Sequence, residues 1–194
     1  MKTLSKIAVL MLIALFATSG AFAQKNQVKT QIEGNLGLFL PLGTFGDVSK
    51  MGFGIIGTGH FRMEKDFWLT GSIGYVSFSG KDVGAYGFSY SYPTVSVIPI
   101  LAGCRYDFIQ KGEKWFPYIG AELGFMITSV GSTDYDGVSA SSTDLGLTLK
   151  GGFRYNLSPG WDFDGQLKFY NNFGNGASAN FFGIQAGVCY SLAN

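Results

Sequence analysis

The residues of this chain that could do chemistry are few and scattered. His60 is the only histidine, and no serine and carboxylate stand around it in a recognisable motif. Asp134 and Asp136 precede a glycine in a polar stretch, and Asp162 and Asp164 flank a phenylalanine. A calcium loop needs about six to eight oxygen ligands at set spacing, so neither acidic pair is sufficient. The sequence predicts no catalytic residue, no cofactor, no cofactor-binding residue and no metal ligand.

A larger set of charged residues shares one feature: each stands at an alternate position, opposite in parity to apolar residues. Side chains alternate between the two faces of a strand, so this pattern places the charges on one face. Acidic and basic members are equal in number, as an enclosed interior requires, because buried charges must be paired. Glycines separate them and leave room for long side chains in a narrow interior. The predicted lumen charge network is Glu33, Arg62, Arg105, Asp107, Glu122, Lys150, Arg154, Asp162, Asp164 and Lys168.

The elements that would carry these charges repeat along the chain. The last is the clearest, since Phe182, Ile184 and Val188 share one parity while Gly183 and Gln185 share the other. Such segments with turn residues between them are typical of transmembrane β-barrels. We predict an all-β fold, an eight-stranded antiparallel up-and-down transmembrane β-barrel with a polar, filled lumen. The predicted strands are 31–42, 52–63, 67–79, 94–108, 115–129, 144–156, 161–171 and 182–192.

The connections between these segments alternate between long and short. Long, polar or glycine-rich stretches cover 43–51, 81–92, 132–143 and 174–180, and the intervening connections are short turns. Outer-membrane barrels have short periplasmic turns and longer extracellular loops, so both ends of the barrel chain are expected on the periplasmic side. Pro99 stands inside the fourth predicted strand and predicts a local bulge.

Composition decides which face of the strands meets lipid. Only 14% of residues are charged, and mean hydropathy is +0.20, whereas a soluble domain carries roughly a quarter charged residues. The net charge of +1 gives no electrostatic reason to expect a nucleic-acid partner. Aromatic residues of the apolar parity stand near the short turns, as in the interfacial girdles of membrane barrels. They are Phe61, Tyr106, Phe108, Tyr155, Trp161, Phe163 and Tyr190.

The N-terminal residues have the form of a signal peptide. Lys2 and Lys6 precede an apolar run over 7–16, and Ala21 and Ala23 have the spacing of a cleavage site. The run is too short to span a bilayer core of ~30 Å. We therefore expect a signal peptide over 1–23 and one outer-membrane β-barrel domain over 24–194.

The second long loop carries four aromatic residues of one parity, Tyr86, Phe88, Tyr90 and Tyr92. One interpretation is a hairpin extension of the two flanking strands, stabilised by aromatic cross-strand pairs. The other is an interaction patch, because exposed aromatic side chains mark partner sites. The pattern favours the hairpin.

The leader, the eight strands and the alternating connections together give the chain a family likeness. With hairpin segments such as 71–75 and 120–124, it resembles the small eight-stranded outer-membrane β-barrels of Gram-negative bacteria, the OmpA/OmpX-like family. The resemblance implies a monomer in the bacterial outer membrane. Its implied partners are outer-membrane lipids, lipopolysaccharide, periplasmic chaperones and the barrel assembly machinery, with no nucleic acid. Family members usually end on an aromatic residue, whereas this chain ends on Asn194.

An eight-stranded barrel leaves an interior that side chains can fill. The expected function is therefore non-enzymatic, in envelope integrity or in surface interaction through extracellular loops. The alternative is a narrow, porin-like channel or transporter for small solutes. A third is a lipid-modifying enzyme, because some small barrels resemble acyl-transferring or deacylating enzymes that use a histidine and a serine near the outer rim. His60 is instead expected near the periplasmic end, facing inward.

Overall fold

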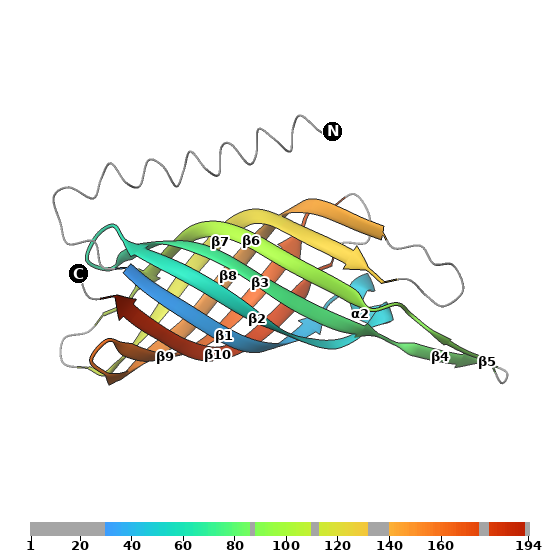
Figure 1. Cartoon of the computed structure of the whole chain (residues 1–194), viewed down its shortest axis with the longest axis horizontal. Coiled ribbons are helices and arrows are strands. Elements are labelled where there is room, and N and C mark those ends of the chain that lie inside the picture. Colours follow the sequence, from blue (N-terminus) through green and yellow to red (C-terminus); the bar gives the residue numbers. More distant parts are fainter. Residues whose placement is uncertain (1–29, 86–87, 110–112, 132–139, 175–178, 193–194) are drawn as a thin grey trace, which may run out of the picture.

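The computed structural model describes residues 30–85, 88–109, 113–131, 140–174 and 179–192, with backbone only for 83–85 and 88–90. Eight strands form a closed barrel in the order β1-β10-β9-β8-β7-β6-β3-β2, and β4 and β5 form a separate hairpin (Figure 1). The elements are β1 (Thr30–Pro41), α2 (Thr44–Val48), β2 (Ser49–Arg62), β3 (Phe67–Gly80), β4 (Asp82–Ala85), β5 (Phe88–Ser91), β6 (Val95–Asp107), β7 (Trp115–Val130), β8 (Ala140–Ser158), β9 (Trp161–Asn172) and β10 (Phe181–Leu192). The predicted eight-stranded antiparallel barrel is confirmed.

The first and last strands close the barrel. They pair antiparallel without interruption, from Thr30 opposite Leu192 to Pro41 opposite Phe181. Every other neighbouring pair in the barrel is also antiparallel and sequential. Closure leaves no unpaired strand edge within the apolar core of a bilayer, where an unpaired backbone group would cost several kcal/mol. Among the described residues, no helix has the length and apolar character needed to cross a membrane.

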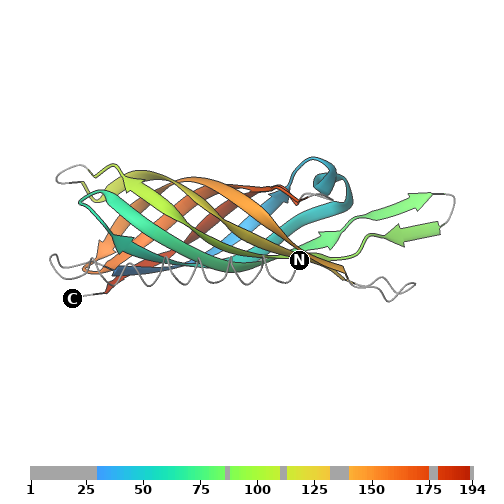
Figure 2. The same ribbon diagram turned by 90° about the horizontal axis from the view of Figure 1, so that it is seen from above.

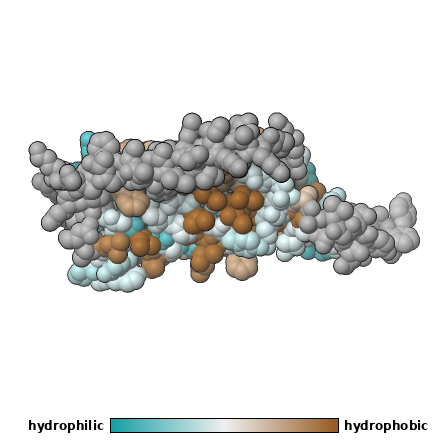
Figure 3. All heavy atoms as spheres, turned by 45° about the horizontal axis from the view of Figure 1, so that its top comes forward, coloured by the Kyte–Doolittle hydropathy of each residue, from teal (hydrophilic) through white to brown (hydrophobic). Residues whose placement is uncertain are grey.

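The two parities of each strand separate as the alternation predicts. Outward-facing apolar side chains remain exposed, among them Leu36 at 64% and Phe53 at 70%. Figure 3 shows such apolar side chains as brown patches on the outside of the barrel. Inward-facing residues such as Arg154 and Phe181 are fully buried. The apolar outside fits a lipid environment.

The connections place different elements at the two ends of the barrel (Figures 1 and 2). We call the end with α2 and the β4–β5 hairpin the loop end, and the opposite end the turn end. At the turn end Gly160 has φ of 84°, a left-handed conformation that glycine adopts without strain, and it closes the β8–β9 connection. Six predicted girdle aromatics near this end are 37–45% exposed, and Trp161 packs on Tyr190 with ring centroids 4.7 Å apart.

Two local expectations are corrected by the structure. The first long loop contains the one-turn helix α2, and β2 begins at Ser49, because Phe45 on α2 finds an apolar site against Phe78, with ring centroids 4.9 Å apart. The predicted bulge at Pro99 is wrong. The pairing of β3 with β6 omits the positions opposite Pro99 and Ile98 and resumes in the same register, so the strand accommodates the missing N–H without an extra residue.

Inward-facing glycines let neighbouring strands approach, and Gly103 gives a test. A Cβ at Gly103 would lie 2.0 Å from the Ala121 carbonyl oxygen, whereas a Cβ at the outward-facing Gly34 would meet nothing within 4 Å. We expect Gly103→Ala to lower the free energy of unfolding by about 1–3 kcal/mol, because the new methyl group overpacks against backbone. Gly34→Ala should leave it almost unchanged. Urea unfolding in lipid vesicles measures both, and equal effects would contradict this account.

Candidate functional site

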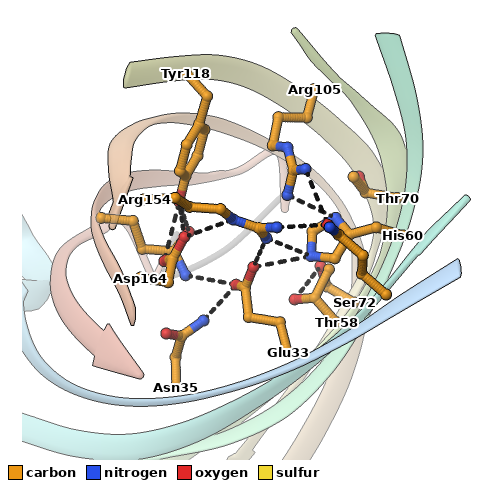
Figure 4. A network of polar contacts seen from close by, with 12 residues as sticks. Glu33, Asn35, Thr58, His60, Thr70, Ser72, Arg105, Tyr118, Arg154 and Asp164 are labelled. Atoms are coloured by element: carbon orange, nitrogen blue, oxygen red, sulfur yellow. Dashed lines mark hydrogen bonds and ion pairs between the residues drawn. The ribbon is translucent and has the colours of Figure 1, made fainter. Parts of the chain in front are cut away.

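The turn-end half of the lumen is filled by a network of charged side chains, with Glu33 near its centre (Figure 4). Glu33 accepts hydrogen bonds from Asn35 Nδ2 at 2.5 Å, Gln166 Nε2 at 3.1 Å and the Arg154 guanidinium. Its Oε2 also lies 2.8 Å from His60 Nε2. The residues come from β1, β2, β8 and β9, so the network ties opposite walls of the barrel together.

Arg154 crosses the lumen and connects the carboxylates of two strands. Its Nε lies 3.2 Å from Asp164 Oδ2, and its Nη1 donates to Gln31 Oε1 at 2.5 Å. The Tyr118 hydroxyl donates to the same Asp164 carboxylate, at 2.9 and 3.0 Å to its two oxygens. Arg154, Asp164 and Glu33 are each at most 3% exposed. Removing one partner of such a buried ion pair leaves the other charge without compensation.

Two further groups complete the polar half. Arg105 donates to both oxygens of Asp107, at 2.6 and 3.0 Å, and to His60 Nδ1 at 3.1 Å. Glu122 holds two lysines, with Lys150 Nζ at 2.5 Å and Lys168 Nζ at 3.4 Å.

The Glu122 carboxylate also accepts from the hydroxyls of Ser72 at 2.8 Å and Thr70 at 3.0 Å. These groups therefore satisfy one another inside the barrel, as buried polar groups must.

The structure places nine of the ten predicted lumen charges in buried positions. Arg62 is the exception: it is only half-buried, it stacks over Trp68 at 4.6 Å, and it makes no ion pair within the described part of the chain. Asp162 is buried but accepts a hydrogen bond from Asn156 at 3.0 Å in place of a cation. Parity along the strands indicated which residues face inward. It could not indicate which of them meet.

His60 has the surroundings of a structural residue. Its Nδ1 accepts from Arg105, so the ring proton of the neutral imidazole lies on Nε2 and is donated to Glu33. Arg154 Nη2 lies 3.1 Å from Nε2 on the same side. The side chain is 1% exposed, so a substrate outside the barrel cannot reach it. The described residues contain no group of three or more histidine, cysteine, aspartate or glutamate side chains suited to hold a metal.

The loop-end half of the lumen is apolar, which the sequence interpretation did not anticipate. Phe181 lies at its centre, with ring centroids 4.5 Å from Tyr170, 5.2 Å from Phe78 and 5.8 Å from Phe39. The cluster also contains Phe45, Ile56, Val76, Val95, Val97, Leu101, Met126 and Ala179. Most of these residues stand on the same parity as the lumen charges, near the loop ends of their strands. That parity was the signal that could have revealed them.

The aromatic positions of the second long loop lie on and around the β4–β5 hairpin. The hairpin is present, but its register sets Tyr90 opposite Val83 and Phe88 opposite Ala85, so the expected aromatic-to-aromatic pairs are absent from these strands. Tyr92 is half-buried at the hairpin base, where its N–H donates to the Lys81 carbonyl at 2.9 Å. Tyr86, the acidic segment 134–137 and the predicted signal peptide lie outside the described residues.

Polar contacts at its base hold the hairpin to the barrel. Lys50 on β2 donates to Asp82 Oδ2 at 2.7 Å, and Ser91 donates to Asp82 Oδ1 at 2.6 Å. The hydrogen bond from Lys50, with that from Ser91, lowers the pKa of Asp82 below its usual value. Lys81 Nζ also donates to the Gly46 carbonyl at 2.5 Å, which joins the hairpin base to α2.

Comparisons with known proteins agree with this architecture. The family described as "Outer membrane protein beta-barrel domain" matches residues 8–191. The structure of Neisserial surface protein A (NspA) superposes with a TM-score of 0.64 at 20% identity, covering 84% of this chain and 97% of NspA. The corresponding values for OprG from Pseudomonas aeruginosa are 0.62, 14%, 86% and 97%.

A third solved structure is that of Ail from Yersinia pestis, in complex with the heparin analogue sucrose octasulfate. Its TM-score is 0.54 at 15% identity, and the match covers 86% of this chain and 100% of Ail. At these identities the likeness is one of fold. The search of curated proteins returns no match.

The Arg154 contacts predict a large loss of stability on substitution. Arg154→Met leaves the Glu33 and Asp164 carboxylates buried without this cation, and we expect the free energy of unfolding to fall by about 3–5 kcal/mol. Arg62→Met removes only a cation–π contact and should cost at most about 1 kcal/mol. Adding Glu33→Gln to Arg154→Met should recover part of the loss. Urea unfolding in lipid vesicles tests all three variants, and equal costs for Arg154→Met and Arg62→Met would contradict the network.

The Lys50 contact predicts a pH response at the hairpin base. Because the pKa of Asp82 is lowered, the ion pair contributes at pH above the ordinary aspartate pKa and is lost as pH falls through the lowered value. Lys50→Met should raise the pKa of Asp82 toward its ordinary value. Carbon-13 NMR titration of the Asp82 carboxyl measures this shift. An identical titration curve in Lys50→Met would show that the ion pair does not form in solution.

Proposed function

Because the chain belongs to the outer membrane protein β-barrel domain family, we propose that it is a closed, non-enzymatic barrel that acts through the elements at its loop end. It is an integral β-barrel protein of the bacterial outer membrane. Short turns face the periplasm in such barrels and longer connections face outward. By this rule the loop end faces outward, so that α2, the β4–β5 hairpin and the loop-end parts of β7 and β8 lie at the cell surface.

The observation that carries this proposal is that side chains fill both halves of the lumen. In the polar half, Trp68, Arg105 and Arg154 are each at most 1% exposed; in the apolar half, so are Phe39 and Phe181. A permeating ion would have to separate paired charges and then cross an apolar layer without polar partners, which is unfavourable at both steps. The narrow channel expected as the alternative therefore has less support than the closed barrel.

An enzymatic role also has little support. His60 is enclosed between Glu33, Arg105 and Arg154 inside the barrel, and it already uses both ring nitrogens in hydrogen bonds. A general base must come within hydrogen-bond reach of the proton that it removes. The surroundings of His60 favour its assignment as a positioning group for the two arginines over a role in modifying lipids.

The loop end offers ordered elements on which a surface role can act. α2 is fixed by Phe45 in the apolar cluster, and the β4–β5 hairpin is held by the Lys50–Asp82 ion pair. Ail, which has the same fold, was solved in complex with a heparin analogue, and this supports a ligand-binding role for barrels of this kind. Surface interaction is therefore preferred here to a purely structural role in the envelope.

The proposed partners within the envelope follow from the outer face of the barrel. Its exposed Leu36, Phe53 and Ile55 would contact lipid chains, including those of lipopolysaccharide in the outer leaflet. Passage across the periplasm with so many apolar side chains calls for chaperones, and insertion calls for the barrel assembly machinery. Because backbone closure is achieved within one chain, a monomer is sufficient to form the barrel.

Planar-bilayer recording tests the closed lumen. We expect no sustained discrete openings from the folded wild-type barrel, because both halves of the lumen are packed. A variant emptied in both halves, R105S/R154S/F39A/F181A, should conduct if heat-modifiable gel mobility shows that it still folds. Sustained openings of the wild-type protein would contradict the closed barrel and favour the narrow channel.

A further inference from the structure

The connection from β2 to β3 lies at the turn end of the barrel (Figure 1) and carries polar groups without partners. We call residues 62–68 the β2–β3 turn. Arg62 Nε, Asp66 Oδ1 and Trp68 Nε1 are buried and have no hydrogen-bond partner within the described part of the chain. Neither Arg62 nor Asp66 forms an ion pair with the other or with any other described residue. Groups of this kind are rare in folded proteins and are usually met by a water, an ion or a ligand.

Trp68 holds the Arg62 guanidinium in place. The two residues are directly opposite each other in the pairing of β2 with β3, and Arg62 Cζ lies 4.6 Å from the centroid of the indole ring. Arg105 Cζ lies over the same ring at 5.1 Å, but its charge is already paired with Asp107. The Arg62 guanidinium therefore keeps an unpaired charge in a fixed position. Its planar set of N–H donors matches the oxygens of a phosphate group.

Asp66 adds an acceptor to the same turn. Its backbone carbonyl accepts a hydrogen bond from the Asp107 N–H at 2.9 Å, which fixes the turn against β6. Arg62 and Asp66 are half-buried, and Glu64 and Lys65 between them are exposed, so the turn can be reached from outside the barrel. An unpaired cation and an unpaired anion on one turn are complementary to a zwitterion, in which a phosphate and an ammonium group are joined by a short carbon linker.

The outer surface beside this turn suits the acyl chain of a lipid. Apolar side chains of the turn and of the end of β2 are 37–48% exposed, namely Phe61, Met63 and Phe67. Farther along the barrel wall, Gly59 on β2 is opposite Gly71 on β3, and Gly71 is opposite Ala102 on β6. A Cβ at Gly59 would come no closer than 3.8 Å to its nearest neighbour. Three small residues side by side therefore leave room for a lipid chain below the apolar rim.

We propose that the β2–β3 turn binds the headgroup of a phospholipid of the phosphatidylethanolamine class. Arg62 donates to the phosphate, Asp66 accepts from the headgroup ammonium, and one acyl chain lies over Gly59 and Gly71. The quaternary ammonium of phosphatidylcholine has no N–H to donate, and phosphatidylglycerol has no cation, so each satisfies only Arg62. The inference rests on the proposed orientation, which places the turn end at the periplasmic leaflet of the membrane.

Native mass spectrometry of the full barrel tests lipid retention. The protein is released from nanodiscs that hold equal amounts of phosphatidylethanolamine, phosphatidylcholine and phosphatidylglycerol with identical acyl chains. The wild-type barrel should retain phosphatidylethanolamine about threefold over phosphatidylcholine, as expected for one exposed charge pair. Arg62→Met should lower the retention of phosphatidylethanolamine about tenfold, because a charge-assisted contact to phosphate is lost. Lys114→Met removes another exposed cation at the turn end and should leave retention unchanged.

Two further variants separate the parts of the site. Asp66→Asn should abolish the preference for phosphatidylethanolamine over phosphatidylcholine and leave the retention of phosphatidylcholine unchanged. Glu113→Gln, at an exposed acidic residue of the turn end, is its matched control and should keep the preference. Gly59→Leu fills the space for the acyl chain and should lower the retention of all three lipids. Heat-modifiable gel mobility shows whether each variant is folded.

The indole N–H resonances provide a measurement on the wild-type protein. The Trp68 signal should shift when phosphatidylethanolamine replaces phosphatidylcholine in the nanodisc, because the ligand contacts the guanidinium that lies on this ring. The signals of Trp115 and Trp161 serve as internal references and should not change. The same Trp68 shift on addition of inorganic phosphate to a phosphatidylcholine nanodisc would assign the site to a free anion and overturn the lipid assignment.

Three results of the retention experiment would also overturn the proposal. They are equal retention of phosphatidylethanolamine and phosphatidylcholine by the wild-type barrel, unchanged retention in folded Arg62→Met, and a preference that survives Asp66→Asn. Both leaflets of the nanodisc have the same composition, so the result does not depend on which end of the barrel faces the periplasm. None of these results would alter the bilayer recordings, so failure of the lipid site and failure of the closed barrel are distinguishable.

Discussion

The structure depends on one constraint: in a bilayer, every backbone N–H and C=O group must find its partner within the protein. The pairing of β1 with β10 meets this constraint by closing the sheet. Once the sheet is closed, side chains along each strand alternate between the lipid outside and a narrow interior. The apolar outside, the packed lumen and the placement of all connections at the two ends follow from this closure.

The narrow interior in turn dictates how the charges are arranged. Among the described residues, four buried cations and five buried carboxylates share the turn-end half of the lumen, and a buried charge without a hydrogen-bonding or ionic partner would be costly. Arg154 relieves this by contacting carboxylates from two strands, and Glu122 does so by holding two lysines. Inward glycines such as Gly103 and Gly120 provide the space, since a Cβ there would collide with neighbouring atoms.

The division of the lumen into polar and apolar halves has a functional consequence. The aromatic cluster around Phe181 closes the loop end, and α2 contributes Phe45 to it. The same cluster therefore seals the barrel and anchors a surface element. With the interior occupied, the groups still able to meet a partner are those of the elements at the loop end, such as α2 and the base of the β4–β5 hairpin.

The sequence alone determined the number of strands and which residues face the lumen. Alternation predicted the eight strands, and the parity of Glu33, Arg105 or Lys168 was enough to place each inside, because the side-chain period of a strand is two. Parity also marked Phe39 and Phe181 as inward, although composition alone did not suggest an apolar half. The tertiary structure decided which inward residues meet, since partners such as Glu33 and Arg154 lie 121 residues apart in the chain. It also decided where the pairing between adjacent strands ends at the rim. Strand tilt and register set this point, and no single segment of the sequence encodes them.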